Sequence, residues 1–202
     1  MIAIVDYGVG NLFSLSSSLK KIGAEVVVSG DKEVIESADK IILPGVGAFR
    51  DAIKKLTESG LKEVVISECE KGKPLLGICL GMQMLFDESY EDGKYEGLHL
   101  IPGSVRPISE VIPKSYKVPH IGWNRLDIKK PSKLLEFIQD GDYVYFVHSF
   151  YAADCENYIV SMSEYGYPIT ASVENKNVYG CQFHPEKSGK VGLNILKGFI
   201  SL

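Results

Sequence analysis

A cysteine flanked by two glycines is the residue of this chain best suited to nucleophilic chemistry. Cys79 lies in the run Gly77-Ile78-Cys79-Leu80-Gly81, between a predicted buried strand at residues 74–79 and a predicted helix at residues 80–89. A nucleophile on a sharp turn between strand and helix is held in the open, and small neighbours let a substrate approach closely. The positive end of the helix favours the thiolate of a group whose ordinary pKa is about 8.5. The alternative is a buried, unreactive cysteine, which is common in protein cores.

A thiol nucleophile needs a base and a group that orients the base. His184 follows a predicted strand at residues 178–183, and Glu186 comes two positions later. Because alternate side chains of an extended chain share a face, His184 and Glu186 point the same way, and Pro185 stiffens the link between them. These residues predict a Cys79–His184–Glu186 triad, in which the carboxylate holds the imidazole in one tautomer.

The histidines leave other assignments open. His148 also follows a predicted strand and is a rival base, whereas His99 and His120 have no patterned partner. The alternative for His184 is a surface position in a turn before a helix, with Glu186 as an acidic residue of the helix start.

Acyl transfer to a thiol also requires hydrogen-bond donors for a developing oxyanion. The backbone N–H of Leu80, next after the nucleophile, is one candidate. A glycine-rich loop follows the third predicted strand, and its unusual backbone freedom makes Val46 and Gly47 candidates for the second donor; the alternative is a plain glycine turn. Gln83 lies about one helical turn after the nucleophile on the same face, so its amide can reach the same pocket.

Alternating strands and helices in the first half of the chain predict how these groups are positioned. This alternation favours a mostly parallel α/β sheet flanked by helices. Closely spaced strands in the second half favour antiparallel strands added to that sheet, within one domain of residues 1–202. We expect strands at residues 2–7, 24–29, 40–43, 74–79, 98–107, 118–123, 125–128, 143–147, 158–163, 169–174 and 178–183, and helices at 11–22, 34–37, 48–69 with a break at 59–60, 80–89, 133–138 and 188–202.

Composition and charge disfavour several function classes. Hydrophobic residues make up 45% and charged residues 24% of the chain, as in globular proteins, and no apolar run is long enough to cross a bilayer. The net charge of −4 and the pI near 5.6 offer no basic surface for nucleic acid. The four scattered cysteines form no C-x-x-C pair, so we expect no metal site, no disulfide framework and a reducing, cytoplasmic setting. The chain opens at once on a predicted strand, so we expect no signal peptide.

Gly8-Val9-Gly10 lies between a predicted strand and a predicted helix, as a dinucleotide-binding fingerprint does. Asp31, near the end of the second predicted strand, stands where the acid that binds ribose would be. However, Phe13 occupies the position of the third glycine, where its bulk would block close packing of helix on strand. We therefore expect no nucleotide cofactor, and no other cofactor is indicated.

Two motifs together resemble the class I, or triad, glutamine amidotransferases: G-I-C-L-G-M-Q at residues 77–83 and H-P-E at residues 184–186. Further segments resemble more narrowly the glutaminase subunits of imidazole glycerol phosphate synthases, from histidine biosynthesis, and the match runs from residue 1 to the C-terminal helix. They are D-Y-G-V-G-N-L at 6–12, P-G-V-G at 44–47, P-H-I-G-W-N at 119–124, F-V-H-S-F-Y at 146–151 and H-P-E-K-S at 184–188.

The resemblance implies the fold of that family and the hydrolysis of glutamine to glutamate and ammonia. Cys79 would form a glutamyl thioester, His184 would move protons, and the Val46–Gly47 peptide would turn its N–H toward the oxyanion. The ammonia would pass to a (β/α)₈ cyclase subunit, the partner in a heterodimer, which makes imidazole glycerol phosphate and an aminoimidazole carboxamide ribotide (AICAR). In this family the turn of that peptide is coupled to the partner, so the free subunit is expected to be nearly inactive.

The resemblance also assigns substrate contacts. Gln83 and the backbone of Ser149 and Phe150 match family positions that hold glutamine, beside Gly47. Position 150 departs from the family pattern, because it is Phe where Tyr is common. A backbone contact would survive this change, whereas a hydroxyl contact would not.

The matching positions at the partner interface are Asn11, Trp123, Tyr145 and Lys187. Core packing is the alternative role for the two aromatic residues. Two other functions stay open for the whole chain. One is the glutaminase of another synthase, such as that of anthranilate or GMP, and the other is a non-catalytic α/β binding or regulatory module.

Overall fold

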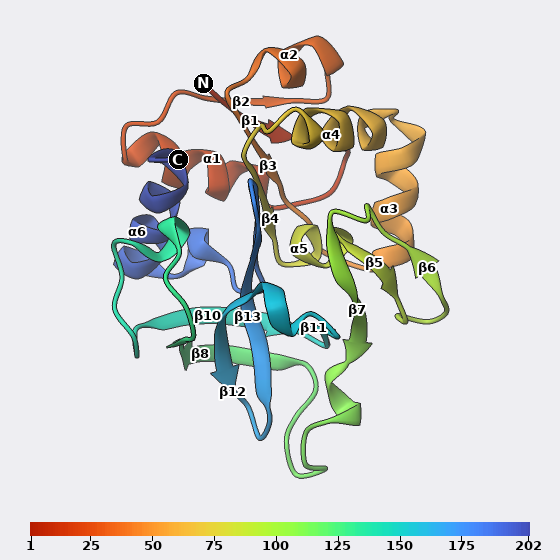
Figure 1. Ribbon diagram of the computed structural model, residues 1–202, viewed down its shortest axis with the longest axis vertical. Coiled ribbons are helices and arrows are strands. Elements are labelled where there is room, and N and C mark those ends of the chain that lie inside the picture. Colours follow the sequence, from red (N-terminus) through yellow and green to blue (C-terminus); the bar gives the residue numbers. More distant parts are fainter.

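Eight strands form one central sheet in the computed structural model, which describes residues 1–202 (Figure 1). Their order across the sheet is β2, β1, β3, β4, β14, β13, β12, β9. The first five are parallel, and the last three continue the sheet in antiparallel pairing, so the predicted sheet is confirmed. The bounds are β1 Ile2–Val5, β2 Val26–Ser29, β3 Lys40–Leu43, β4 Leu75–Ile78, β9 Asp127–Ile128, β12 Ile159–Glu164, β13 Pro168–Asn175 and β14 Val178–Cys181.

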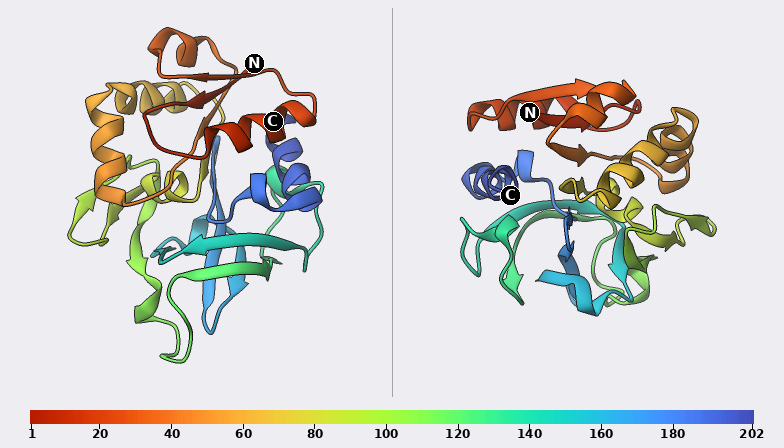
Figure 2. Two further views of the ribbon diagram at one scale, coloured as in Figure 1. Left: turned by 180° about the vertical axis from the view of Figure 1, so that it is seen from behind. Right: turned by 45° about the horizontal axis from the view of Figure 1, so that its top comes forward.

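Helices cover both faces of the parallel half of this sheet, as Figures 1 and 2 show. Residues of β1 and β4 are all buried and none carries a polar side chain, as expected for parallel strands covered on both sides. One face is covered by α1 (Leu12–Lys21) and α6 (Gly189–Ile200), and the other by α2 (Lys32–Ser37), α3 (Phe49–Glu58), α4 (Leu61–Glu70) and α5 (Leu80–Met84).

Two small sheets stand beside the central one (Figure 1). One pairs β8 (His120–Arg125) antiparallel with β10 (Tyr143–His148). The other has the order β11 (Phe150–Ala153), β7 (Ile101–Pro107), β5 (Phe86–Ser89) and β6 (Tyr95–Glu96). Four short 3₁₀ helices complete the chain: η1 Ile108–Glu110, η2 Lys133–Leu135, η3 Glu156–Tyr158 and η4 Pro185–Lys187.

None of the helices combines the length and the apolar character that crossing a membrane requires.

Some elements differ from the predictions. The helix after Cys79 ends at Met84 instead of continuing to residue 89, and the segment from Phe86 onward is the strand β5. Phe86 is fully buried and β5 pairs in parallel with β7, so tertiary strand pairing overrides the local helix preference. The sequence analysis predicts no strand at β11, which begins after a single residue beyond β10 and so has no turn signal to mark it. β14 is antiparallel to β13 as expected, but it is parallel to β4 on its other side.

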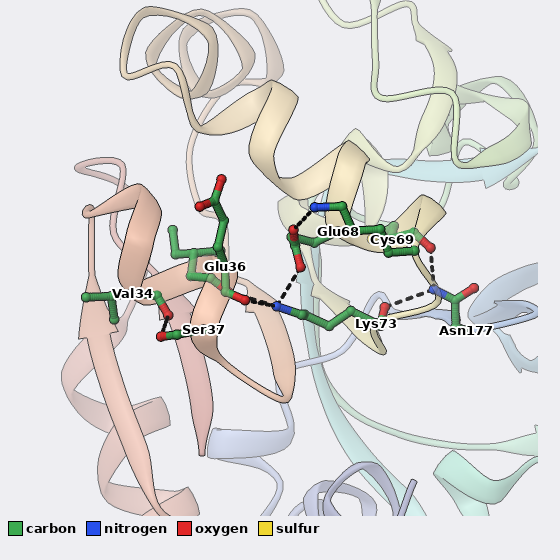
Figure 3. Close-up of polar contacts among 9 residues, drawn as sticks. Val34, Glu36, Ser37, Glu68, Cys69, Lys73 and Asn177 are labelled. Atoms are coloured by element: carbon green, nitrogen blue, oxygen red, sulfur yellow. Dashed lines mark hydrogen bonds and ion pairs between the residues drawn. The ribbon is translucent and has the colours of Figure 1, made fainter.

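A buried ion pair ties α2 and α4 to the start of β4 (Figure 3). The Glu68 side chain is 6% exposed, and its carboxylate accepts from Lys73 at 2.7 Å and from Lys71 at 2.6 Å. Lys73 also donates to the carbonyl oxygen of Glu36 at 2.6 Å, and Asn177 donates to the Lys73 carbonyl oxygen at 2.9 Å. Lys73 therefore joins α2, α4 and the turn between β13 and β14 at one point.

The two lysines that share Glu68 make a matched pair for a stability test. The Lys73 side chain is 12% exposed and that of Lys71 is 64% exposed. We expect Lys73→Ala to lower the free energy of unfolding by about 2 kcal/mol, because it removes charged hydrogen bonds from a buried carboxylate. Lys71→Ala should cause a much smaller loss, since water screens its pair. Urea unfolding of both variants measures the difference, and equal losses would contradict the central role of Lys73.

Candidate active site

Cys79 lies on the turn between β4 and α5, at the carboxyl end of a central parallel strand. Its φ of 55° and ψ of −112° are rare for a residue other than glycine. The neighbouring glycines allow the close packing of this turn. A Cβ on Gly77 would lie 2.7 Å from the Gly81 carbonyl oxygen, and one on Gly81 would lie 1.9 Å from the Leu43 carbonyl oxygen. Strain of this kind persists where the surroundings hold it, and it is concentrated at functional sites.

β14 brings a base and its orienting group to the cysteine. It runs parallel to β4, and the backbone N–H of Cys79 donates to the Cys181 carbonyl oxygen at 2.8 Å. The chain is extended up to His184, but the predicted extended link to Glu186 is wrong, because Pro185–Lys187 form the 3₁₀ helix η4. This turn still places Oε1 of Glu186 2.8 Å from Nδ1 of His184. Cys79 and His184 line the same cavity, and the His184 and Glu186 side chains are each 3% exposed. The structure therefore brings a hydrogen-bonded imidazole and carboxylate to the cavity that the cysteine lines.

The environment of His184 sets its charge. Burial by itself lowers the pKa of the imidazole, but its hydrogen bonds to Cys79 and Glu186 and their negative charges raise the pKa from 6.5 to about 9. At neutral pH the ring is therefore protonated and can give a proton to a leaving amine.

His148, the rival base, is occupied by buried hydrogen bonds. Its Nδ1 lies 2.7 Å from the Phe150 carbonyl oxygen, so this nitrogen carries the proton. Its Nε2 lies 3.0 Å from Nδ1 of His120 and accepts a hydrogen bond from it. Burial lowers the pKa of both rings to about 4, so both are neutral at pH 7. With both nitrogens in use, His148 holds the Phe150 carbonyl and does not compete with His184 for the proton of the thiol.

The glycine loop after β3, predicted to supply an oxyanion donor, lies beside the cysteine. Gly47 has a φ of 92°, and a Cβ there would meet no atom within 4 Å, so the Val46–Gly47 peptide has room to turn. The start of the loop is anchored, because the Tyr7 hydroxyl donates to the Pro44 carbonyl oxygen at 2.7 Å. The Leu80 N–H is among the first of α5, which have no partner within a helix. Val46, Gly47 and Leu80 line the same cavity as the cysteine.

This cavity has a volume of about 290 Å³ and draws its lining from both halves of the chain. The hydrogen bonds of Gln83 determine which of its own atoms is free to bind a ligand. Its amide nitrogen donates to the Phe150 carbonyl oxygen at 3.2 Å and to Oε1 of Gln182 at 3.0 Å. Both amide hydrogens are then in use, so Gln83 offers a ligand only its oxygen, an acceptor. The residues singled out from the sequence that line the cavity are Val46, Gly47, Cys79, Leu80, Gln83, His148, Ser149, Phe150 and His184.

Comparison with known proteins identifies the family. Residues 3–201 match the family model described as "Glutamine amidotransferase class-I". The chain belongs to the class-I glutamine amidotransferase family. It is 50% identical over 200 residues to a protein of Caldanaerobacter subterraneus subsp. tengcongensis named "Imidazole glycerol phosphate synthase subunit HisH", across 98% of this chain and 97% of the relative. A relative of the same name from Methanothermobacter thermautotrophicus is 48% identical over 202 residues, across 100% of this chain and 98% of the relative.

Solved structures of low sequence identity share the fold of this amidotransferase. One, described as a glutamine amidotransferase, has a TM-score of 0.77 at 17% identity and covers 99% of this chain and 97% of its own. Another, the structure of PurLQS from Thermotoga maritima, has a TM-score of 0.74 at 18% identity with the same coverage. At these identities the likeness shows the family fold alone.

The sequence analysis did not single out two further polar residues of the amidotransferase site. Glu91 lines the cavity, its carboxylate accepts from the Phe49 N–H at 2.7 Å, and burial raises its pKa. It lies in an acidic loop, and no motif marks it. Gln182 is fully buried between Gln83 and Cys79. It precedes His184 by two positions on an extended segment, so the alternation of side chains along that segment could have identified it.

The residues predicted to contact a partner lie outside the buried core. Trp123 and Tyr145 are opposite each other on β8 and β10, with ring centroids 6.2 Å apart, and Trp123 is 54% exposed. That exposure excludes core packing for Trp123, whereas Tyr145 is half-buried. Lys187 Nζ lies 5.9 Å from the centroid of the Tyr145 ring. Asn11 precedes α1, and its side chain makes no capping hydrogen bond.

Replacing Glu186 with glutamine removes the negative charge beside the imidazolium. We expect the pKa of His184, about 9 in this structure, to fall in Glu186→Gln. The folded protein binds this proton more tightly than the unfolded chain, in which the pKa of the imidazole is near 6.5. The bound proton therefore stabilises the fold fully below about pH 6.5, and this contribution is lost as the pH rises through about 9. The wild type should therefore lose stability over that range, and Glu186→Gln should lose less. NMR titration of the imidazole and thermal unfolding at about pH 6 and about pH 9 measure the two effects.

Glu174→Gln is the matched control, because Glu174 and Glu186 each have a buried carboxylate oxygen without a hydrogen-bond partner. It should leave the His184 titration unchanged. An unchanged His184 pKa in Glu186→Gln would contradict the orienting role of that carboxylate.

Proposed function

We propose that this chain is the glutaminase subunit of an imidazole glycerol phosphate synthase, which hydrolyses glutamine and passes the ammonia to a partner subunit. The observation that carries the proposal is the hydrogen-bonded pair of His184 and Glu186 at the cavity that Cys79 also lines. The printed names of the two relatives that match over nearly their whole length support it.

Cys79 acts as the nucleophile. Its thiolate attacks the carbon of the glutamine side-chain amide, and the carbonyl electrons move onto oxygen to give a tetrahedral oxyanion. The N–H groups of Leu80 and of the Val46–Gly47 peptide donate to that oxyanion. As the C–N bond breaks, protonated His184 gives its proton to the departing nitrogen. Ammonia leaves, and the glutamyl group stays on the sulfur as a thioester.

Water then releases glutamate. Neutral His184 takes a proton from the water as its oxygen attacks the thioester carbonyl, and the C–S bond breaks. The Cys79 thiolate and the imidazolium are restored. Glu186 lies 2.8 Å from the imidazole and holds it through both steps, stabilising the imidazolium without taking its proton.

The polar groups around the cavity match the two ends of a free amino acid. The Glu91 carboxylate complements an α-ammonium group, and the free oxygen of Gln83 accepts a hydrogen bond from an N–H of the ligand. We assign the backbone of Ser149 and Phe150 to hold the substrate. Phe150 contributes only through its backbone, because its ring has no hydroxyl.

We assign the partner as a (β/α)₈ cyclase subunit in a heterodimer with this chain. The cyclase would use the ammonia to convert a bound ribonucleotide to imidazole glycerol phosphate and AICAR. The exposed Trp123 and the neighbouring Tyr145 support this assignment, because aromatic residues are enriched at protein interfaces, and Lys187 lies beside the Tyr145 ring. Asn11, whose side chain makes no capping hydrogen bond to α1, would extend the contact.

Two alternatives are less well supported. The glutaminase of another synthase would use the same triad, but the full-length relatives near half identity carry the name of this synthase. A non-catalytic module would have no need for a raised imidazole pKa beside a strained cysteine.

We further propose that residues 1–202 act as one domain in the cytoplasm. One sheet draws strands from both halves of the chain. All four cysteines are free, which fits a reducing compartment.

The central test measures glutamate formation by the chain mixed with a cyclase subunit and its ribonucleotide. Cys79→Ala should lower the stimulated rate by at least about 10³-fold, because no other group can form the thioester. Cys155→Ala, which changes a buried cysteine outside the cavity, is the control and should keep the rate. If Cys79→Ala keeps the stimulated rate, the proposed mechanism is wrong.

Two further assays separate the alternatives. A glutamine-like chloroketone should alkylate Cys79 selectively, and glutamine should protect it. Failure to label with no protection would favour a non-catalytic module. Stimulation by the partner of another synthase, and not by the cyclase, would favour the other glutaminase.

The interface assignment predicts weaker binding when Trp123 is truncated. We expect Trp123→Ala to raise the dissociation constant for the cyclase at least about tenfold, since buried tryptophans dominate interface energies. Phe137→Ala is a suitable control, because Phe137 is 47% exposed, close to the 54% of Trp123, and lies on a different segment. Calorimetric titration measures both. Equal affinities for wild type and Trp123→Ala would exclude Trp123 from the interface.

A further inference from the structure

Gln182 is a fully buried amide that the two-step mechanism does not use. It directly follows β14, and its backbone N–H donates to the Ala171 carbonyl oxygen at 2.8 Å, so the strand pairing continues through it. Because alternate residues of an extended segment share a face, Gln182 points to the same side as His184, and the 3₁₀ helix η4 that follows places Glu186 against the His184 ring. One short stretch of chain therefore brings Gln182 to the Cys79 sulfur and His184 to the same cavity.

The hydrogen bonds around Gln182 define which end of its amide faces the sulfur. The Phe150 carbonyl oxygen can only accept, so the group of Gln83 that lies 3.2 Å from it must be the amide nitrogen. That nitrogen also lies 3.0 Å from the Gln182 amide, which must present its oxygen there. The Gln182 nitrogen is then the end left for Cys79, and it lies 3.7 Å from the sulfur. The fixed carbonyl thus determines the orientation of both amides in turn.

We propose that Gln182 is a further catalytic residue, which donates a hydrogen bond to the Cys79 sulfur and so stabilises the thiolate that attacks glutamine. The same side chain holds Gln83 in the orientation that offers its oxygen to the substrate. This inference rests on the proposed glutaminase function and extends it.

The chemistry of the donor explains why glutamine suits this position. A hydrogen bond to the charged form of a group favours that form, and Gln182 adds a neutral donor to the charge supplied by His184. Glutamate would keep the oxygen that Gln83 needs but would replace the donor with a second negative charge. An apolar side chain would remove both contacts. The donor is also fully shielded from water, where a hydrogen bond has its largest effect.

The test measures the rate at which iodoacetamide alkylates Cys79 in the full chain, without glutamine or partner, as a function of pH. We expect Gln182→Glu and Gln182→Met to slow alkylation about tenfold at pH 7, since a hydrogen bond to a charged group is lost. Cys79→Ala gives the background from the three other cysteines, which are buried.

Ser172→Ala is the matched control. Ser172 is also fully buried, its hydroxyl lies 2.6 Å from that of Ser161, and it is on the neighbouring strand β13. This variant loses a buried hydrogen bond of the same sheet without touching the cavity, so it should be alkylated at the wild-type rate. If Gln182→Met fails to fold, Gln182→Glu preserves the size and the acceptor oxygen and still removes the donor.

Alkylation of both Gln182 variants at the wild-type rate would overturn the proposal. So would an equal slowing in Ser172→Ala, which would assign the effect to a general loosening of the sheet. The glutaminase assay with the cyclase reports separately on the function. If the cyclase does not stimulate the wild type, the proposed function is refuted, but the alkylation rates can still be compared. If the wild type is stimulated and the Gln182 variants are alkylated slowly, both proposals are supported.

Discussion

The parallel pairing of β4 with β14 is the constraint on which the site depends. Its register sets Ile78 beside Cys181, and the backbone N–H of Cys79 continues the ladder by donating to the Cys181 carbonyl oxygen at 2.8 Å. The residues after Cys181 therefore emerge next to the nucleophile, although they lie about a hundred positions later in the chain. A shift of this register by one residue would direct His184 and Glu186 to the opposite face.

Close packing around the nucleophile is the second requirement. The turn at Cys79 is possible because residues 77 and 81 are glycines. A Cβ at either position would lie within 3 Å of backbone atoms. The same contact brings the start of α5 against the end of β3, which leads into the loop of Gly47. The cysteine and the proposed oxyanion loop are thus held by one packed junction, so each limits the position of the other.

Burial gives the two histidines near the cavity opposite roles. His184 faces a sulfur and a carboxylate, and its pKa is raised to about 9. His148 faces only a carbonyl oxygen and a second imidazole, and burial lowers its pKa to about 4. One ring is therefore a proton donor at neutral pH and the other is a neutral structural link. The difference follows from the neighbours of each ring, since both are largely shielded from water.

Local sequence determined much of this protein. Alternation of strands and helices predicted the mostly parallel sheet, and the motif around Cys79 together with the spacing of His184 and Glu186 indicated a triad. What depends on distant pairing was decided by the tertiary structure alone. It decided that the chain after Met84 is a strand, that His148 is occupied by His120 and Phe150, and that Gln182 lies against the sulfur. Periodicity reports which face a side chain occupies, but only the packing of distant segments decides what that face meets.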